Sequence, residues 1–339
     1  MSRPTVRPLL HVGLHKSGTS WLQNHLFAGK ARAGFRTCGN ENDAKRELVR
    51  PHDLDFDPGR VRAFYQPRFD RIAAEGSVPV ITAERLCGDM LFGAHDSARM
   101  AERLAATFPA GRVLIVIREQ RRMLLSSYQQ YVKMGGVLSL ERYLHDPGHA
   151  HPWPCDLSHF DYERLIRHYH RLFGAENVLV LPLELFQADQ HAFVARIVDF
   201  AGATPDPGAL GRLRFDARSN RSLPAQTVAI KRRANYVLRS RLNPWAPIDG
   251  RHGFGAAVNS LLVRKARRLP DRLENRTRIG MQTRIQEAVG DRYRVGNART
   301  SELIGTDLGQ YGYDMPEPLL AGSGDLRPAE SVTGRGPEV

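Results

Sequence analysis

The sequence predicts an α/β fold in which a central parallel sheet lies between two layers of helices, a three-layer sandwich. Short apolar runs of strand length alternate along the chain with longer segments of helical periodicity, an order typical of βαβ units. One of these runs, at 113–117, is continuously apolar and rich in β-branched residues. Such a run is expected of a parallel strand that is covered on both faces.

The expected elements follow one another from the N-terminus. Strands are predicted at 9–14, 78–83, 113–117 and 178–181, where apolar residues run together. Apolar side chains at helical spacing predict helices at 21–27, 99–108, 121–134, 162–173 and 191–201. Gly135 and Gly202 follow two of these helices, in the position where glycine commonly ends a helix.

The chain divides by composition into a core and a C-terminal cap. We expect residues 1–8 to be a flexible N-terminus and residues 9–315 to form one domain, with a core at 9–210 and a basic helical cap at 211–315. Residues 316–339 are rich in Gly, Pro, Ser and Glu and are expected to be a disordered tail. The sequence shows neither a secretory signal nor a run near the about 20 apolar residues that span a bilayer, so the cytoplasm is the expected location.

The 339 residues carry a net charge of +13, and the positive charge is concentrated late in the chain. Between positions 221 and 300 there are eighteen Lys and Arg residues against five Asp and Glu residues. This block indicates either an anionic partner, such as a nucleotide, an acidic glycan or a membrane surface touched peripherally, or simply a solvated helical face. Cys38, Cys87 and Cys155 lack C-x-x-C spacing, which favours reduced thiols over a disulfide framework or a zinc site.

A glycine-containing turn joins the first predicted strand to the first predicted helix. Gly13 and Gly18 have the G-x-x-x-x-G spacing of a phosphate-binding loop, whose backbone N–H groups and helix N-terminus bind anions. The lysine of a nucleotide triphosphatase would follow the second glycine, but Thr19 stands there and Lys16 precedes it. The strand at 113–117 ends in Arg118 and not in a carboxylate for Mg²⁺. Lys16 and Arg118 thus provide fixed positive charges where a nucleotide triphosphatase would bind Mg²⁺, and no metal is expected.

Two motifs in this region resemble those of the sulfotransferase family. The stretch 10–23 is similar to the family's 5′-phosphosulfate loop, with His15 where many members carry proline. Arg118 and Ser126 match the family's second signature, an arginine at a strand end followed eight residues later by a serine. The resemblance extends over about residues 9–203. It implies a P-loop NTPase-like fold and 3′-phosphoadenosine 5′-phosphosulfate (PAPS) as sulfuryl donor, with 3′-phosphoadenosine 5′-phosphate (PAP) as product. The residues that it implies for donor binding are His15, Lys16, Ser17, Gly18, Thr19, Ser20, Trp21, Arg118 and Ser126.

Transfer of a sulfuryl group needs a cation at the leaving oxygen and a base for the acceptor proton. Lys16 is the candidate for the first role, and Glu84, just past the strand at 78–83, is the candidate base. A structural carboxylate paired with Arg85 or with a helix N-terminus is the alternative interpretation of Glu84. Arg85, His151 and His159 are candidates for contact with the acceptor, and a histidine is the alternative base.

Three function classes follow from these observations. The first is a sulfotransferase acting on a hydroxyl or amine of a glycan, lipid or small metabolite. A P-loop kinase for a small molecule is the second, disfavoured by the displaced lysine and by Arg118. A nucleic-acid-binding protein without catalytic activity is the third, suggested only by the basic block, and no motif for specific nucleic-acid binding supports it.

Overall fold

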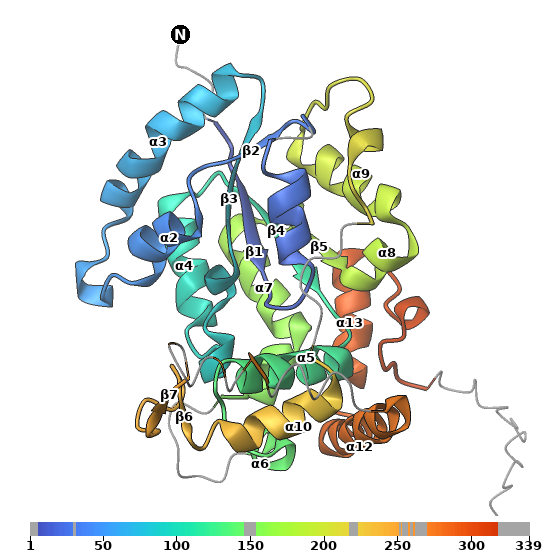
Figure 1. Ribbon diagram of the computed structural model, residues 1–339. Helices are drawn as coiled ribbons and strands as arrows, with labels where there is room; N and C mark the ends of the chain where they lie inside the picture. The colour runs from blue at the N-terminus through green and yellow to red at the C-terminus, as the bar shows by residue number, and fades with distance from the viewer. Residues whose placement is uncertain are drawn as a thin grey trace, which may run out of the picture.

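The computed structural model describes residues 6–29, 32–145, 154–216, 223–250, 252, 257, 260–261 and 270–317. Five parallel strands form its central sheet in the order β2-β3-β1-β4-β5 (Figure 1). Their bounds are Leu9–Gly13 (β1), Phe35–Thr37 (β2), Val78–Ala83 (β3), Arg112–Ile117 (β4) and Val178–Pro182 (β5). The predicted α/β fold with a central parallel sheet is confirmed.

Helices connect the strands and continue beyond them. Their bounds are Thr19–Trp21 (α1), Glu41–Ala44 (α2), Pro58–Ala74 (α3), Ser97–Thr107 (α4), Gln120–Lys133 (α5), Leu140–Leu144 (α6), Tyr162–Phe173 (α7), Leu183–Ala188 (α8), Gln190–Ala201 (α9), Ala225–Ala234 (α10), Asp271–Val289 (α12) and Arg294–Ile304 (α13). The first helix continues as a π-helical turn over Leu22–Leu26. Two further strands, Leu238–Arg239 (β6) and Ile248–Asp249 (β7), pair near α10.

Alternate residues of each buried strand point to opposite faces of the sheet, which creates the three layers. On β4, Val113, Ile115 and Ile117 join a core cluster with residues of α3, α4, α5 and α7. Leu114 and Val116 of the same strand join a second cluster with α1, α8 and α9. Burial on both faces explains why the strand is apolar throughout.

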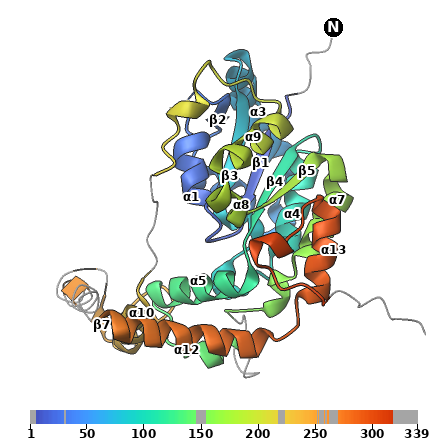
Figure 2. The same cartoon turned by 90° about the vertical axis from the view of Figure 1, so that its right-hand side faces the viewer.

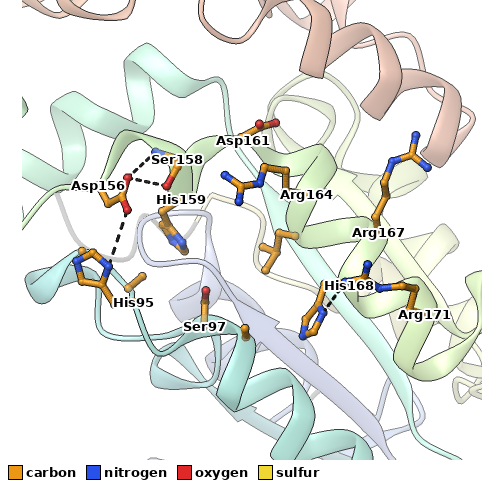
Figure 3. A pocket seen from close by; sticks show the side chains of 14 residues that line it. His95, Ser97, Asp156, Ser158, His159, Asp161, Arg164, Arg167, His168 and Arg171 are labelled. Carbon is orange, nitrogen blue, oxygen red and sulfur yellow. Dashed lines mark hydrogen bonds and ion pairs between the residues drawn. The ribbon is translucent and has the colours of Figure 1, made fainter.

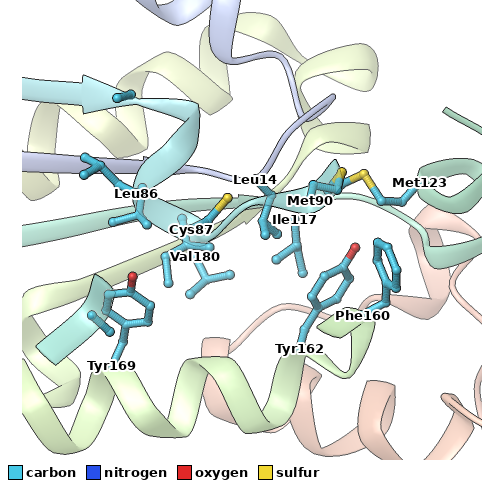
Figure 4. Close-up of a cluster of buried hydrophobic side chains, with 14 of the residues drawn as sticks. Leu14, Leu86, Cys87, Met90, Ile117, Met123, Phe160, Tyr162, Tyr169 and Val180 are labelled. Carbon is cyan, nitrogen blue, oxygen red and sulfur yellow. The ribbon is translucent and has the colours of Figure 1, made fainter. Parts of the chain in front are cut away.

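Beneath the carboxyl ends of the strands, the first core cluster supports the loops that follow them. Leu14, Ile117 and Met123 pack there with Tyr162, which comes from the start of α7 (Figure 4). All four side chains are at most 1% exposed. The bases of the loop after β1 and of helix α5 are therefore anchored in close-packed apolar surroundings, where small displacements are costly.

The basic C-terminal region is helical, as expected, and packs across α5. Helix α12 lies alongside α5, and α10 contacts both helices (Figure 2). Buried Asn297 of α13 connects this region to the core: its Oδ1 accepts a hydrogen bond from Gln120 Nε2 at 2.6 Å, and its Nδ2 donates to the carbonyl of Asp314 at 2.8 Å.

The cysteines and the lengths of the helices bear on two further expectations from the sequence. The thiols of Cys38, Cys87 and Cys155 are free and buried, and burial raises the pKa of each to about 12. Within the described ranges, no helix has both the length and the apolar character required to span a membrane.

The contacts of Asn297 generate a stability prediction. Asn297→Ala should lower the free energy of unfolding by about 1–3 kcal/mol, because the Gln120 amide and the Asp314 carbonyl lose buried partners. Asn275→Ala, at an exposed position of α12, serves as the control and should change it by less than about 0.5 kcal/mol. Urea unfolding measures both, and equal effects would contradict the anchoring role of Asn297.

Candidate active site

The strand order creates a crevice at one edge of the sheet. The chain leaves β1 toward β2 on one side and leaves β4 toward β5 on the other, so the connections of these neighbouring strands diverge. The register places Gly13 beside Val116, and Val12 beside Ala83. Ligands of open parallel sheets bind at such a point, outside the carboxyl ends of the strands. The loop 14–18, Glu84 and Arg118 all follow strands that end there.

The loop after β1 has an unusual backbone. Lys16 has a φ of 68° and Gly18 a φ of 84°, and the first value is uncommon for a residue with a side chain. Gly13 allows the loop to close, since a Cβ atom at this position would lie 2.6 Å from Thr19 Oγ1. The turn directs the chain straight into helix α1, as a phosphate-binding loop requires.

Several side chains of the predicted donor site hold the loop from inside. Ser17 Oγ donates to the carbonyl of Leu14 at 2.6 Å, and Thr19 Oγ1 donates to the same oxygen at 3.4 Å. Trp21 is buried, donates from Nε1 to the carbonyl of Arg214 and stacks on the ring of Phe215. Ser20 is only half-buried. The sequence did not indicate which of these side chains point inward.

Arg118 lies next to the loop at the end of β4, and Ser126 lies on α5. Arg118 Nη1 donates to the carbonyl of Lys16 at 3.2 Å. Arg118 Nε and Ser126 Oγ are buried and have no hydrogen-bond partner among the described residues. Both residues line a cavity of about 800 Å³ whose opposite wall is α12, with Arg278, Ile279 and Gln282. Burial lowers the pKa of the Arg118 guanidinium. An anion bound in this cavity would offset the free-energy cost of burying the charge.

The backbone around Arg118 is fixed on both sides. Tyr162 Oη donates to the carbonyl of Arg118 at 2.6 Å. Glu119 caps α5: its carboxylate accepts hydrogen bonds from the N–H groups of Arg121 at 3.0 Å and Arg122 at 2.9 Å. The turn after β4 is therefore stabilised by a side-chain cap.

Glu84 pairs with a residue of the loop. Its Oε2 lies 3.0 Å from His15 Nδ1, and this hydrogen bond, aided by the charge of Lys16, lowers the pKa of the Glu84 carboxyl although burial opposes it. Burial lowers the pKa of Lys16. His11, below the pair, contacts Thr82 Oγ1 at 2.8 Å, and its complete burial lowers its pKa to about 4. His11 is thus neutral at pH 7.

Helix α5 separates two cavities. Ser126 lines the cavity beside α12. Ser127 and Gln130 line a second cavity of about 420 Å³, whose lining also includes His15 and Glu84. The structure therefore brings Glu84, His15, Lys16 and Arg118 together, with one cavity on each side of α5.

Of the candidates for contact with the acceptor, Arg85 and His159 line different cavities. Arg85 lines the cavity of Glu84 and forms ion pairs with Asp96 at 3.3 Å and Asp89 at 3.6 Å. His159 lines a separate cavity of about 560 Å³ with His95 and Arg164 (Figure 3). Burial, with a contribution from nearby His15, lowers the pKa of His159 to about 4.

His151 lies outside the described residues. Within those residues, no three His, Cys, Asp or Glu side chains are grouped as a metal ion would require.

Sequence reasoning missed two parts of the site. The signal in the sequence was His15, which stands at a position commonly held by proline. Its pairing with Glu84 could not be predicted, because that pairing depends on the register between β1 and β3. The wall formed by α12 had no local signal, because α12 begins at Asp271 and is far along the chain from Arg118 and Ser126.

Comparisons with known proteins agree with this architecture. The sequence model of the Sulfotransferase family matches residues 8–207. No curated protein matches the chain. Among solved structures, a sulfotransferase from Alicyclobacillus acidocaldarius matches with a TM-score of 0.50 and 15% identity, over 91% of this chain and 99% of that one.

Two further solved structures are more distant. The sulfotransferase domain of an olefin synthase from Synechococcus matches with a TM-score of 0.38 and 15% identity, over 80% of this chain and 91% of that one. A mouse sulfotransferase complexed with PAP matches with a TM-score of 0.32 and 14% identity, over 88% and 89% of the two chains. The family match spans more than half of the sequence, and the chain belongs to the sulfotransferase family.

Proposed function

We propose that this sulfotransferase uses PAPS as its donor and transfers the sulfuryl group to a hydroxyl or amine of an acceptor, releasing PAP. The observation that carries the proposal is the pair of buried donors without partners, Arg118 Nε and Ser126 Oγ, beside a phosphate-binding loop. Buried polar groups are nearly always paired in native proteins. A 3′-phosphate in the cavity would accept from both, and the family resemblance assigns this ligand to these positions.

The loop and Lys16 would hold the other end of the donor. The loop 14–18 and the start of α1 would contact the 5′-phosphosulfate, as helix N-termini do in other phosphate sites. Lys16 would meet the charge that develops on the oxygen bridging phosphorus and sulfur. Burial lowers the pKa of the Lys16 ammonium, and an anionic donor beside it would stabilise the charged form.

Glu84 would act as the general base. As the acceptor oxygen forms a bond to sulfur, the bond from sulfur to the bridging oxygen breaks, and the acceptor proton passes to Glu84. The low pKa keeps this carboxylate ionised at neutral pH, and the hydrogen bond from His15 orients it. Arg85 would border the bound acceptor, since it lines the same cavity.

Ser126 provides a matched test of donor recognition. Ser126→Ala should weaken binding of PAP about 10-fold or more, because a hydrogen bond to a charged group contributes about 1.5–3 kcal/mol. It should leave binding of adenosine 5′-phosphosulfate, which lacks the 3′-phosphate, nearly unchanged. Ser127→Ala is the control, since Ser127 Oγ donates to the carbonyl of Met123 and faces the other cavity. Calorimetry measures all four combinations, and equal losses for both nucleotides in Ser126→Ala would refute the assignment.

Glu84 and His15 generate a prediction on rate and pH. Glu84→Gln should reduce transfer of labelled sulfate from PAPS to acceptors in a cell extract about 100-fold or more, with PAP affinity retained. In the unmodified protein, activity should fall at acidic pH as Glu84 becomes protonated. His15→Asn should move this limb to higher pH, because the pKa of Glu84 is lowered chiefly by His15. Full activity of Glu84→Gln, or an unmoved limb in His15→Asn, would contradict these roles.

A further inference from the structure

The segment that runs from the end of α10 to β7 exposes large apolar side chains to solvent. They are Tyr236 (56% exposed), Val237 (47%), Trp245 (92%) and Ile248 (37%). Tryptophan is on average one of the more buried residues, so an almost fully exposed ring is unusual. Exposed apolar side chains that are grouped and surrounded by polar ones mark sites of interaction with a protein or a membrane.

The pairing of β6 with β7 brings the exposed side chains together. The N–H group of Ile248 donates to the carbonyl of Val237 at 3.0 Å, and Arg239 Nε donates to the carbonyl of Ala246, the residue after Trp245, at 3.1 Å. The two ends of the segment therefore lie side by side. They form a surface at the end of the molecule opposite α3 (Figures 1 and 2).

The backbone of this segment is fixed from inside. Leu238 and Ala246 are buried, whereas the residues on either side of each are exposed. Buried Asn235 donates from Nδ2 to the carbonyls of Val132 and Gly136, both at 2.8 Å, and so ties the segment to the end of α5. The apolar side chains cannot turn inward without loss of these contacts, so the fold presents them outward.

Basic side chains surround the apolar ones. The sequence from 225 to 248 contains five basic residues and no acidic one; the basic residues are Lys231, Arg232, Arg233, Arg239 and Arg241. Two acids lie at the border of this surface, namely Asp249 at the end of β7 and Asp89, which Arg241 contacts at 3.6 Å. Five basic residues against two carboxylates leave the surface positive, and it therefore attracts an anionic partner.

An anionic membrane fits this combination of side chains. Arginines are attracted to anionic headgroups, and the rings of Trp and Tyr are favoured at the boundary between headgroups and acyl chains. Val237 and Ile248 would gain from contact with acyl chains, whereas binding to a nucleic-acid backbone depends mainly on its phosphates. A second copy of the same surface would bring like charges together. Lipid is therefore the partner that the surface favours.

This surface borders the cavity of Glu84. Arg241 lines that cavity, and so does Asp89, with which it forms an ion pair. Attachment through the surface would therefore bring the cavity close to the headgroups.

We infer that Tyr236, Val237, Trp245 and Ile248, together with Arg233 and Arg239, form a docking surface that binds peripherally to membranes containing anionic lipids. The rings and aliphatic side chains enter the boundary of headgroups and acyl chains, and the arginines contact the headgroups. This binding does not depend on the donor or the acceptor proposed above.

Co-sedimentation with vesicles tests the inference on the full chain. Vesicles of equal parts phosphatidylglycerol and phosphatidylcholine should bind the protein at least 10-fold more tightly than vesicles of phosphatidylcholine alone, and added salt should weaken this binding. Trp245→Ser should weaken it about 10-fold, because the most exposed ring is lost. Leu54→Ser is the matched control, since Leu54 is 90% exposed but is not part of the docking surface, and it should have no effect.

A second pair of variants tests the charge. Arg233→Gln should weaken binding to the anionic vesicles about 5-fold, because one basic side chain near the headgroups is removed. Arg71→Gln removes the same charge from an exposed position on the last turn of α3, at the other end of the molecule, and should leave binding unchanged. Thermal unfolding of the four variants shows whether each of them folds.

Three results would overturn the inference. The first is equal binding to the two kinds of vesicle, or equal losses within either pair of variants. The second is binding of random duplex DNA without binding of vesicles, which would assign the surface to nucleic acid. The third is a dimer that Trp245→Ser abolishes, again without vesicle binding, which would assign the surface to a second copy of the chain. None of these results would affect the proposed function, which is tested by binding of PAP.

Discussion

A hydrogen bond from the Arg118 guanidinium to the Lys16 carbonyl joins the end of β4 to the loop after β1, and the crevice depends on these two segments. Lys16 lies in a left-handed conformation that costs free energy for a residue with a side chain. Arg118 Nη1 holds this loop from the neighbouring strand, and Tyr162 in turn holds the carbonyl of Arg118. One arginine thus fixes the loop with one nitrogen and leaves Nε unpaired toward the cavity.

Electrostatics gives the crevice its preference for anions. Burial lowers the pKa of both Lys16 and Arg118, so each cation is less well solvated here than in water. An anionic ligand would add a counter-charge to both cations, which would thereby take the role that Mg²⁺ has in metal-dependent phosphoryl-transfer sites. The basic C-terminal region takes part in this arrangement through Arg278, which lines the cavity beside α5.

The sequence predicted the parts of the structure that depend on local pattern. The strands at 78–83 and 113–117 were recognised because buried parallel strands are apolar throughout, and their shared edge brought Glu84 and Arg118 to one place. Strand β2, with three residues, is too short to show a period. The contact of His15 with Glu84 and the wall formed by α12 depend on register and on packing between distant segments, which no local pattern encodes. For the same reason, the inward direction of Trp21 became visible only in the structure.

The central claim is that fixed cations, and not a metal, hold a nucleotide with a 3′-phosphate at this crevice. Calorimetric titration of the protein with PAP in the presence of EDTA tests it most directly, with ATP and Mg²⁺ as the comparison. The account predicts binding of PAP at one site without metal, and at least 10-fold weaker binding of ATP with Mg²⁺. Binding of ATP with Mg²⁺ but not of PAP would contradict it and would favour a kinase.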